Sequence, residues 1–456
     1  MGDKPATLGP FTPIIPEWPG RPRVMRFGGC DDPGGYNQTV NELAGLPSDQ
    51  AHPMLDPRFF ERDPASARAL ARAYVQMSRG DDDYNTALNR LLNPFERPRS
   101  LADNLEASRR YLVDVNAYLA EVLDLIPHDM RKFLAMDAEV AALNDALGLL
   151  DLAFRGDGAR VRFEAQRKLY LAKLLFDIDH DPGVQMGPLH KAYFEDLLVK
   201  AFWSKATRVK PIDLFFELAD DGMHITTRTR RARFDDEKWS FHLARVRWPG
   251  RRPIHVYHYG CRFKREMAPF QYTSGEAEYR IEERPIWETL HERRSGSILS
   301  KMIRKGEVHP RKIQDIIGSM FIVKDEPEVE TLQDTLYDIF GGPLHWKDRV
   351  NTIRFPEERD RLNTHSGDGY EVLKSDVDVV YAPAGNQRPY IFSVEVQIYT
   401  IEGFLRTVHS RHYASHQRLK LRQFLEALLP RLFPVSVYGD KTILNCLRRL
   451  EETVAV

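Results

Sequence analysis

Hydrophobic residues recur every three or four positions through residues 63–204, and this is the period of an amphipathic α-helix. Asp63 stands before Pro64, which is typical of a helix start because the carboxylate caps the first turn and proline needs no backbone partner there. Ser100 and Asp103 resemble a capping box in which the usual glutamate is one methylene shorter. The pattern therefore predicts a run of helices with capped beginnings.

Two hydrophobic stripes flank Pro127 in this helical part. The first covers 112–126, and the second continues through 133–154 as one predicted helix. The stripes fit an antiparallel hairpin within the chain or a parallel coiled coil between two chains, and we favour the hairpin. Further helices near 158–178 and 188–204 would complete a bundle.

The pattern changes at about residue 210. Residues 223–265 alternate, are rich in β-branched and aromatic types, and contain a Pro-Gly turn at 249–250, which predicts a small antiparallel sheet. Helix and strand then alternate around one mixed sheet. We expect an α+β multi-domain chain made of a loosely ordered Pro/Gly-rich arm (1–50), a helical region (51–209), a basic β-rich segment (210–286) and a C-terminal α/β domain (287–456).

Composition narrows the class of protein. The 456 residues carry 65 Lys and Arg against 66 Asp and Glu, so no global charge attracts nucleic acid or anionic membranes. The sequence contains no apolar run of about 18 residues, so it predicts no transmembrane helix. The first residues lack the features of a secretory signal. The 3 cysteines include no CxxC pair, which argues against a disulfide scaffold or a structural zinc site. We expect a cytoplasmic protein without membrane contact.

One segment departs from this neutral balance. Between His224 and Glu266 there are 12 Lys and Arg against 4 Asp and Glu, interleaved with aromatic residues. Such a face suits phosphates or RNA. The other interpretation is a solvated sheet face whose charges are balanced by acidic residues elsewhere, and we slightly favour it.

Two carboxylates lie on predicted buried strands of the last domain. Asp315 precedes IIGSMFIV, and Glu395 stands within FSVEVQIYT between Val394 and Val396, which alternation places on the opposite face. Paired carboxylates with phosphate ligands are what Mg²⁺ needs, and a reacting hydroxyl needs a nearby base. Tyr370 follows a glycine in a loop that would let it stack on a nucleobase. A basic helix ahead of this region carries Arg293, Arg294, Lys301, Arg304 and Lys305. These residues suit a triphosphate, and an ordinary solvent-exposed helix would have much the same pattern.

Taken in order, these segments resemble the RelA/SpoT nucleotidyltransferase family, the alarmone synthetases, over roughly 287–425. Five segments of this chain match the family's SIxxKM, DxxGxRxI, GYxSxH, EVQIRT and HxxxK patterns: SGSILSKM (295–302), QDIIGSMFIV (314–323), GDGYEVLK (367–374), VEVQIYT (394–400) and SHQRLK (415–420). The resemblance implies a nucleotidyltransferase-like fold and transfer of the β,γ-pyrophosphoryl group of ATP to the 3′-hydroxyl of GDP or GTP.

The resemblance also implies roles for single residues. Asp315 would hold Mg²⁺, and Glu395 would be a metal ligand or the base on the hydroxyl. Tyr370 would stack on the acceptor guanine. The other nucleotide-binding positions would be Arg293, Ser297, Lys301, Lys305, Gln397, His416 and Lys420.

Four positions depart from the family pattern. Met320 and Tyr399 stand where the family has arginines, while Val372 and Lys374 replace a serine and a histidine. Loss of two arginines removes phosphate or base contacts that Lys374 replaces only in part. Three alternatives follow: guanosine tetraphosphate synthesis with shifted contacts, a toxin-type transfer to tRNA or adenine nucleotides, or a catalytically degenerate nucleotide-binding or interaction module. The basic segment at 223–265 would suit an RNA acceptor.

Long members of that family also carry a metal-dependent hydrolase with His-Asp pairs. His128–Asp129 and His180–Asp181 lack the additional His and Glu-Asp spacing, and each is predicted to cap or end a helix. We therefore expect no hydrolase. The sequence does not decide between a monomer and an oligomer.

Overall fold

The computed structural model describes residues 52–92, 97–221, 224–233, 236–264, 270–274, 277–281, 295–361, 370–383, 388–408 and 423–455. The described residues form two compact units, each assembled from separate stretches of the chain. The helical unit takes its described residues from 52–181, 295–313 and 423–455, and the sheet unit takes them from 182–281 and 314–408. The expected arm (1–50) lies outside the described residues.

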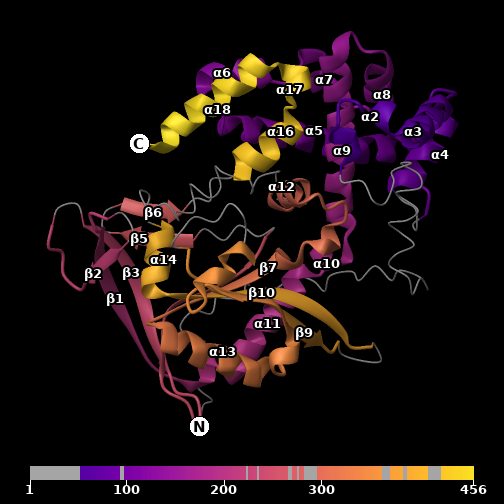
Figure 1. The fold of residues 1–456 in the computed structure, drawn as a ribbon. Coiled ribbons are helices and arrows are strands. Elements are labelled where there is room, and N and C mark those ends of the chain that lie inside the picture. Colours follow the sequence, from indigo (N-terminus) through magenta and orange to yellow (C-terminus); the bar gives the residue numbers. More distant parts are fainter. Residues whose placement is uncertain are drawn as a thin grey trace. The chain divides into compact units, whose positions relative to one another are not determined.

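The helical unit contains long and short helices from all three of its stretches (Figure 1). They are η1 (Pro53–Leu55), α2 (Phe59–Arg62), α3 (Pro64–Met77), α4 (Asp81–Leu92), α5 (Leu101–Asp124), α6 (His128–Leu134), α7 (Ala138–Ala142), α8 (Ala146–Arg155), α9 (Gly158–His180), α12 (Gly296–Lys305), η4 (Pro310–Lys312), the π-helical turn η8 (Phe424–Leu428), α16 (Leu429–Leu432), α17 (Val435–Tyr438) and α18 (Asp440–Ala455).

The predicted caps are confirmed, whereas the prediction of one helix over 133–154 is wrong. Asp63 accepts a hydrogen bond from the backbone N of Ser66, and Ser100 accepts one from the backbone N of Asp103. Beyond Pro127 the chain instead forms α6, α7 and α8, because Asp137 and Asp145 cap new helix starts through the backbone N of Glu139 and Gly148. A hydrophobic period survives these breaks, so periodicity alone does not reveal them.

Helix α9 lies at the centre of the helical unit, and it buries polar as well as apolar side chains. The ammonium of Lys168 donates to the carbonyls of Val140, Ala141 and Leu143 at 2.9–3.1 Å, and so satisfies the end of α7. Burial lowers the pKa of Lys168 to about 8. A polar network thus fixes the short helices onto α9.

The sheet unit is built on an eight-stranded mixed sheet in the order β2-β1-β3-β4-β7-β10-β9-β8. Its strands are β1 (Ala206–Leu218), β2 (Ile225–Arg228), β3 (Glu237–Val246), β4 (Ile254–Phe263), β7 (Ile317–Val323), β8 (Trp346–Asn351), β9 (Leu373–Tyr381) and β10 (Tyr390–Thr400). A separate two-stranded sheet pairs β5 (Phe270–Ser274) with β6 (Ala277–Ile281). All neighbours run antiparallel except β7 and β10, which are parallel.

The helices of the sheet unit are α10 (Pro182–Gln185), α11 (Gly187–Ala201), α13 (Glu326–Phe340) and α14 (Ile401–Val408), with short turns η2 (Trp203–Lys205), η5 (Gln314–Ile316), η6 (Pro343–His345) and η7 (Pro356–Arg361). Helices α11 and α13 lie along one face of the sheet (Figure 1). Phe202, at the end of α11, packs edge-on against Phe321 of β7, with ring centroids 6.1 Å apart. This face forms the sheet's helix-covered core.

Alternation places different residues on the opposite face. There Gly318 of β7 is in register with Glu395 of β10, and Ile322 with Tyr399. Towards β1 and β3 this face packs into a hydrophobic cluster with α14, to which Ile322, Tyr399 and Phe404 belong. Towards β9 it carries charged residues instead. The candidate site lies on this half.

The strands predicted for 223–265 exist, but they do not form a small sheet of their own. Strand β4 pairs with β7, with Arg262 opposite Gly318, so the early strands extend the sheet of the C-terminal part. The described strands between 206 and 281 and those of the C-terminal part therefore belong to the same compact unit. Pairing between strands distant in sequence decides this, and local patterns carry no signal for it.

Candidate functional site

Asp315 lies in η5, directly before β7, as its position ahead of a buried strand predicts. The turn packs against β10, the strand of Glu395. The Oδ2 atom of Asp315 lies 2.5 Å from the ammonium of Lys264, which follows the end of β4. The backbone N of Lys264 donates to the carbonyl of Ile316 at 2.9 Å, and so holds the two segments together.

Glu395 is buried in the middle of β10 and begins a chain of polar contacts. Its Oε2 forms an ion pair with Lys374 of β9, and its Oε1 accepts a hydrogen bond from Gln397 at 2.6 Å. Gln397 in turn accepts from the hydroxyl of Tyr399 at 2.9 Å. The hydroxyls of Tyr399 and Tyr370 are 2.7 Å apart. Four of these residues were selected or noted from the sequence as nucleotide-binding or departing positions, and the structure joins them into one network.

Asp376 lies beside Glu395 in this network, and the sequence analysis missed it. It lies directly opposite Glu395 in the antiparallel register of β9 and β10. Burial raises the pKa of Asp376 to about 6, and the negative charges of Glu395 and Asp315 add to the effect. Its Oδ1 has no hydrogen-bond partner among the described residues. The only signal in the sequence was its position two residues after Lys374, on the same face of the strand.

Asp315, in the turn before β7, and Glu395, on β10, both act electrostatically on the same two residues of β9. Burial works against the charge of Lys374, but the carboxylates of Glu395 and Asp315 raise its pKa above the ordinary value. The same two carboxylates raise the pKa of Asp376. A charged cluster therefore consists of Asp315, Glu395, Asp376, Lys264 and Lys374, which come from the turn before β7, from β10, from β9 and from the end of β4.

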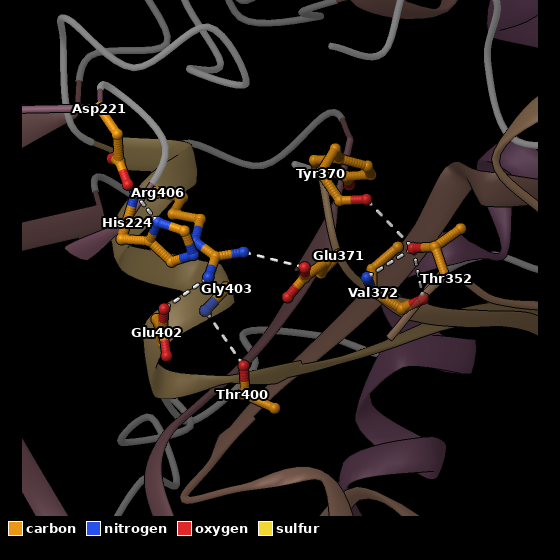
Figure 2. A network of polar contacts seen from close by, with 10 residues as sticks. All are labelled: Asp221, His224, Thr352, Tyr370, Glu371, Val372, Thr400, Glu402, Gly403 and Arg406. Carbon is orange, nitrogen blue, oxygen red and sulfur yellow. Dashed lines mark hydrogen bonds and ion pairs between the residues drawn. The ribbon is translucent and has the colours of Figure 1, made fainter. Parts of the chain in front are cut away.

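Hydrogen bonds from Thr352 and an ion pair from Arg406 hold the segment Tyr370–Val372 (Figure 2). The hydroxyl of Thr352 donates to the carbonyl of Tyr370 at 3.1 Å and accepts from the backbone N of Val372 at 3.0 Å. Arg406 of α14, 9% exposed, forms ion pairs with Glu371 at 2.9 Å and with Glu402. Tyr370 is half-buried and packs against the hydrophobic cluster.

The four departures from the family pattern have structural counterparts. Val372 and Tyr399 are buried in the hydrophobic cluster, and Met320 packs against it. Lys374 instead holds Glu395. Where the family pattern has arginines, this chain therefore has apolar packing and a tyrosine hydroxyl network.

The expected phosphate-binding helix exists as α12, which belongs to the helical unit. Ser297 and Lys301 are half-buried there, and Lys305 is exposed. Arg293, His416 and Lys420 lie outside the described residues.

The donor chemistry of the site fits a hard divalent cation. Asp315 and Glu395 supply carboxylate oxygens, and Oδ1 of Asp376 is a further buried oxygen. A Cβ atom built on Gly318 of β7, the residue opposite Glu395, would meet no atom within 4 Å, so there is open space over β7 at this position. Within the described residues, no group of three or more His, Cys, Asp and Glu side chains is arranged to hold a metal ion. Phosphates and water would have to complete the coordination, as they commonly do for Mg²⁺.

The basic segment has many acidic partners. Arg228 and Arg233 pair with Glu217, Lys238 pairs with Asp213, and Arg251 pairs with Asp334 and Asp338 of α13. These ion pairs favour the interpretation of a sheet face whose charges are balanced locally.

The two His-Asp pairs occupy helix ends, as predicted. His128 begins α6, with Asp129 in its first turn. His180 is the last residue of α9, and its Nδ1 lies 2.9 Å from the carbonyl of Phe176. Among the residues that the structure describes, no helix combines the length and the hydrophobicity needed to cross a membrane.

Comparison with known proteins finds partial structural likenesses. No protein-family model matches the chain, and neither does any curated protein. One matching structure is small alarmone synthetase 1 from Bacillus subtilis bound to its product pppGpp, which is 17% identical to this chain. The match covers 34% of this chain and 70% of the synthetase, with a TM-score of 0.21. A second structure of that synthetase is also 17% identical; the match covers 34% of this chain and 71% of the synthetase, with a TM-score of 0.20. A GTP pyrophosphokinase family protein from Streptococcus pneumoniae is 17% identical; the match covers 34% of this chain and 68% of that protein, with a TM-score of 0.21.

Proposed function

We propose that this chain transfers the β,γ-pyrophosphoryl group of ATP to the 3′-hydroxyl of GDP or GTP, with Mg²⁺ as cofactor. The observation that carries the proposal is the placement of the two carboxylates: Asp315 lies in the turn before β7, this turn packs against β10, and Glu395 stands on β10, the parallel neighbour of β7. The motif order, in which DxxG precedes GY and EVQI, supports the same reaction.

The residues would divide the work by position. In the reaction the 3′-oxygen of the acceptor forms a bond to the β-phosphorus of ATP, the bond from that phosphorus to the bridging α,β-oxygen breaks, and AMP leaves. Mg²⁺, when held by Asp315 and Glu395, would supply positive charge to the phosphates. The hydroxyl proton needs an acceptor, and the carboxylate of Glu395, which the hydrogen bond from Gln397 to Oε1 orients, would take it.

The acceptor's base would contact Tyr370, whose backbone is fixed by Thr352. Its hydroxyl bond to Tyr399 limits the orientations of the ring. Ser297, Lys301 and Lys305 lie on α12 of the helical unit, and Arg293, His416 and Lys420 lie outside the described residues, so the proposal does not rest on these six positions. A cytoplasmic location fits a reaction that consumes ATP and guanosine nucleotides.

A second candidate is a nucleotide-binding module without catalysis. It is favoured by Met320 and Tyr399, which pack with the hydrophobic cluster where the family pattern has arginines. Transfer to tRNA or to adenine nucleotides would keep the chemistry and change only the acceptor.

The test is an incubation of purified protein with Mg²⁺, γ-³²P-ATP and GDP, GTP, ATP or tRNA. We expect labelled guanosine tetra- or pentaphosphate, and a loss of at least about 100-fold in Asp315→Asn and in Glu395→Gln, because transition-state charge would lose its stabilisation. Asp378→Asn is the matched control, since Asp378 lies on β9 and pairs with Lys347. Label transferred to tRNA or to an adenine nucleotide would mean that the chain catalyses the same transfer to a different acceptor. Product at wild-type levels from Asp315→Asn would refute the proposal, and nucleotide binding without product would support the second candidate.

A further inference from the structure

Each of the two converging carboxylates already holds a lysine. Lys264 reaches Oδ2 of Asp315 at 2.5 Å, and Lys374 forms an ion pair with Oε2 of Glu395. The lysines come from β4 and β9, which flank β7 and β10 in the sheet order. The two cations thus approach the carboxylates from strands on either side. Lys264 lies before the part of the chain that resembles the alarmone synthetases, so that resemblance assigns it no role.

The lysines lie nearer to solvent than the carboxylates. The side chains of Lys264 and Lys374 are 24% and 33% exposed, whereas those of Asp315 and Glu395 are 13% and 9% exposed. A lysine carries its charge on a flexible four-carbon stem, so the ammonium moves without a change in the backbone. A ligand that enters from solvent therefore meets ammonium groups first and carboxylates behind them.

A divalent cation and these ammonium groups compete for the same oxygens. Mg²⁺ binds through carboxylate oxygens and substrate phosphates, and its arrival would displace the ammonium groups from Oδ2 of Asp315 and Oε2 of Glu395. The displaced groups need new anionic partners, since a half-buried charge without one is costly. The phosphates that arrive with the metal are such partners.

We propose that Lys264 and Lys374 hold the two carboxylates in the empty site and turn to the phosphates of a nucleoside polyphosphate when a divalent cation takes the carboxylates. The inference rests on the proposed function in that it assigns the cation and the polyphosphate to this site. The chain would therefore bind the metal weakly alone and strongly together with a polyphosphate.

The experiment measures binding rather than turnover. Titration calorimetry measures the binding of Mn²⁺ alone, and of ATP or AMP in saturating Mg²⁺. The proteins compared are the wild-type whole chain and its variants Lys264→Met, Lys374→Met and Lys347→Met. Lys347 is the control because it pairs with Asp378, a carboxylate outside the cluster. In the two site variants we expect the Kd for Mn²⁺ to fall at least about 5-fold and the Kd for ATP to rise at least about 10-fold, with AMP changed less than about 3-fold.

A fall in the Kd for Mn²⁺ together with a rise in the Kd for ATP separates this proposal from a purely structural role of the lysines. If the lysines only neutralised the carboxylates, their removal would tighten Mn²⁺ and leave the ratio of ATP to AMP affinity at the wild-type value, as in Lys347→Met. That result overturns the proposal. Absence of ATP binding by the wild-type chain overturns it as well.

Arginine variants keep the test decisive if a methionine variant does not fold. Lys264→Arg and Lys374→Arg retain the charge, and a guanidinium grips a carboxylate with two hydrogen bonds. We expect them to weaken Mn²⁺ binding at least about 3-fold, the reverse of the methionine variants. Tighter Mn²⁺ binding by the arginine variants would contradict competition. Lysine-dependent binding without any product would retain this inference and reject the proposed function, so the two failures are distinguishable.

Discussion

Asp376 shows how a single residue takes its properties from the strand beside it. The pKa of Asp376 is raised to about 6 by burial first and by Glu395 second. In an unfolded chain the same carboxyl would have its ordinary value near 3.8. The folded protein therefore holds a proton on Asp376 between about pH 4 and pH 6 that the unfolded chain releases.

The sign of this shift predicts a stability change in Asp376→Asn. A raised pKa of an acid contributes stability that is present below about pH 4 and is lost as the pH rises through about 6. The neutral amide avoids that loss, so we expect the variant to gain about 1–3 kcal/mol at pH 7.5 and almost nothing at pH 4. The free energy of unfolding of the sheet unit, from hydrogen exchange of β10 amides at both pH values, checks this.

Asp378→Asn is the matched control for that measurement. Asp378 lies two residues further along β9 and has its own partner, Lys347, so its replacement should not stabilise the protein at pH 7.5. An equal gain in both variants would assign the effect to the net charge of the strand rather than to the cluster.

At the scale of elements, Thr352 directly follows β8 and Val372 directly precedes β9, and hydrogen bonds between these two residues bring the end of one strand to the start of the next. Thr352 is fully buried, and its backbone N donates to the carbonyl of Val372 at 3.0 Å while its hydroxyl accepts from the backbone N of Val372. Arg406 adds a tie from α14 to Glu371. The position of Tyr370 thus depends on three elements that are distant in sequence.

Thr352→Val preserves the shape and removes the hydroxyl. We expect a loss of about 1–3 kcal/mol in the stability of the sheet unit, because the backbone N of Val372 is left without its side-chain acceptor. Thr352→Ser keeps the hydroxyl and is expected to lose less. Urea unfolding of both variants measures the difference, and equal losses would mean that methyl packing rather than the hydrogen bond holds the segment.

At the scale of the whole molecule, the chain alternates between its two units, and the C-terminal stretch belongs to the helical one. Arg167 of α9 donates to the carbonyl of Leu432 and lies 5.0 Å from the ring centroid of Phe433. The hydroxyl of Tyr438 donates to Glu164 at 2.7 Å. The last residues therefore complete the surroundings of α9.

Truncation after residue 422 should consequently loosen a helix more than 240 positions earlier in the chain. We expect the amides of α9 to exchange at least about 10-fold faster, with little change in β7 and β10 of the sheet unit. Arg167→Met in the full chain should act in the same direction and more weakly. Equal acceleration in α9 and β10 would mean that the two units do not respond separately.

The sequence predicted the elements and the positions of Asp315 and Glu395 because local patterns govern both, while Tyr370 and Gln397 were expected from the family resemblance. Periodicity gave the helices, the capping residues Asp63 and Ser100 gave their beginnings, and alternation gave the strands of Asp315 and Glu395. It failed over 133–154, where Asp137 and Asp145 begin new helices without disturbing the hydrophobic period.

Only the tertiary structure decided which residues share the site. Lys264 enters because β4 pairs with β7, and Asp376 enters because the register of β9 and β10 sets it opposite Glu395. Strand partners and register depend on contacts between segments far apart in the chain, and the side-chain pattern of one strand does not name its neighbour. Asp315 and Glu395 were therefore readable from the sequence, whereas Lys264 and Asp376 were not, and Lys374 was noted only as a departure from the family pattern.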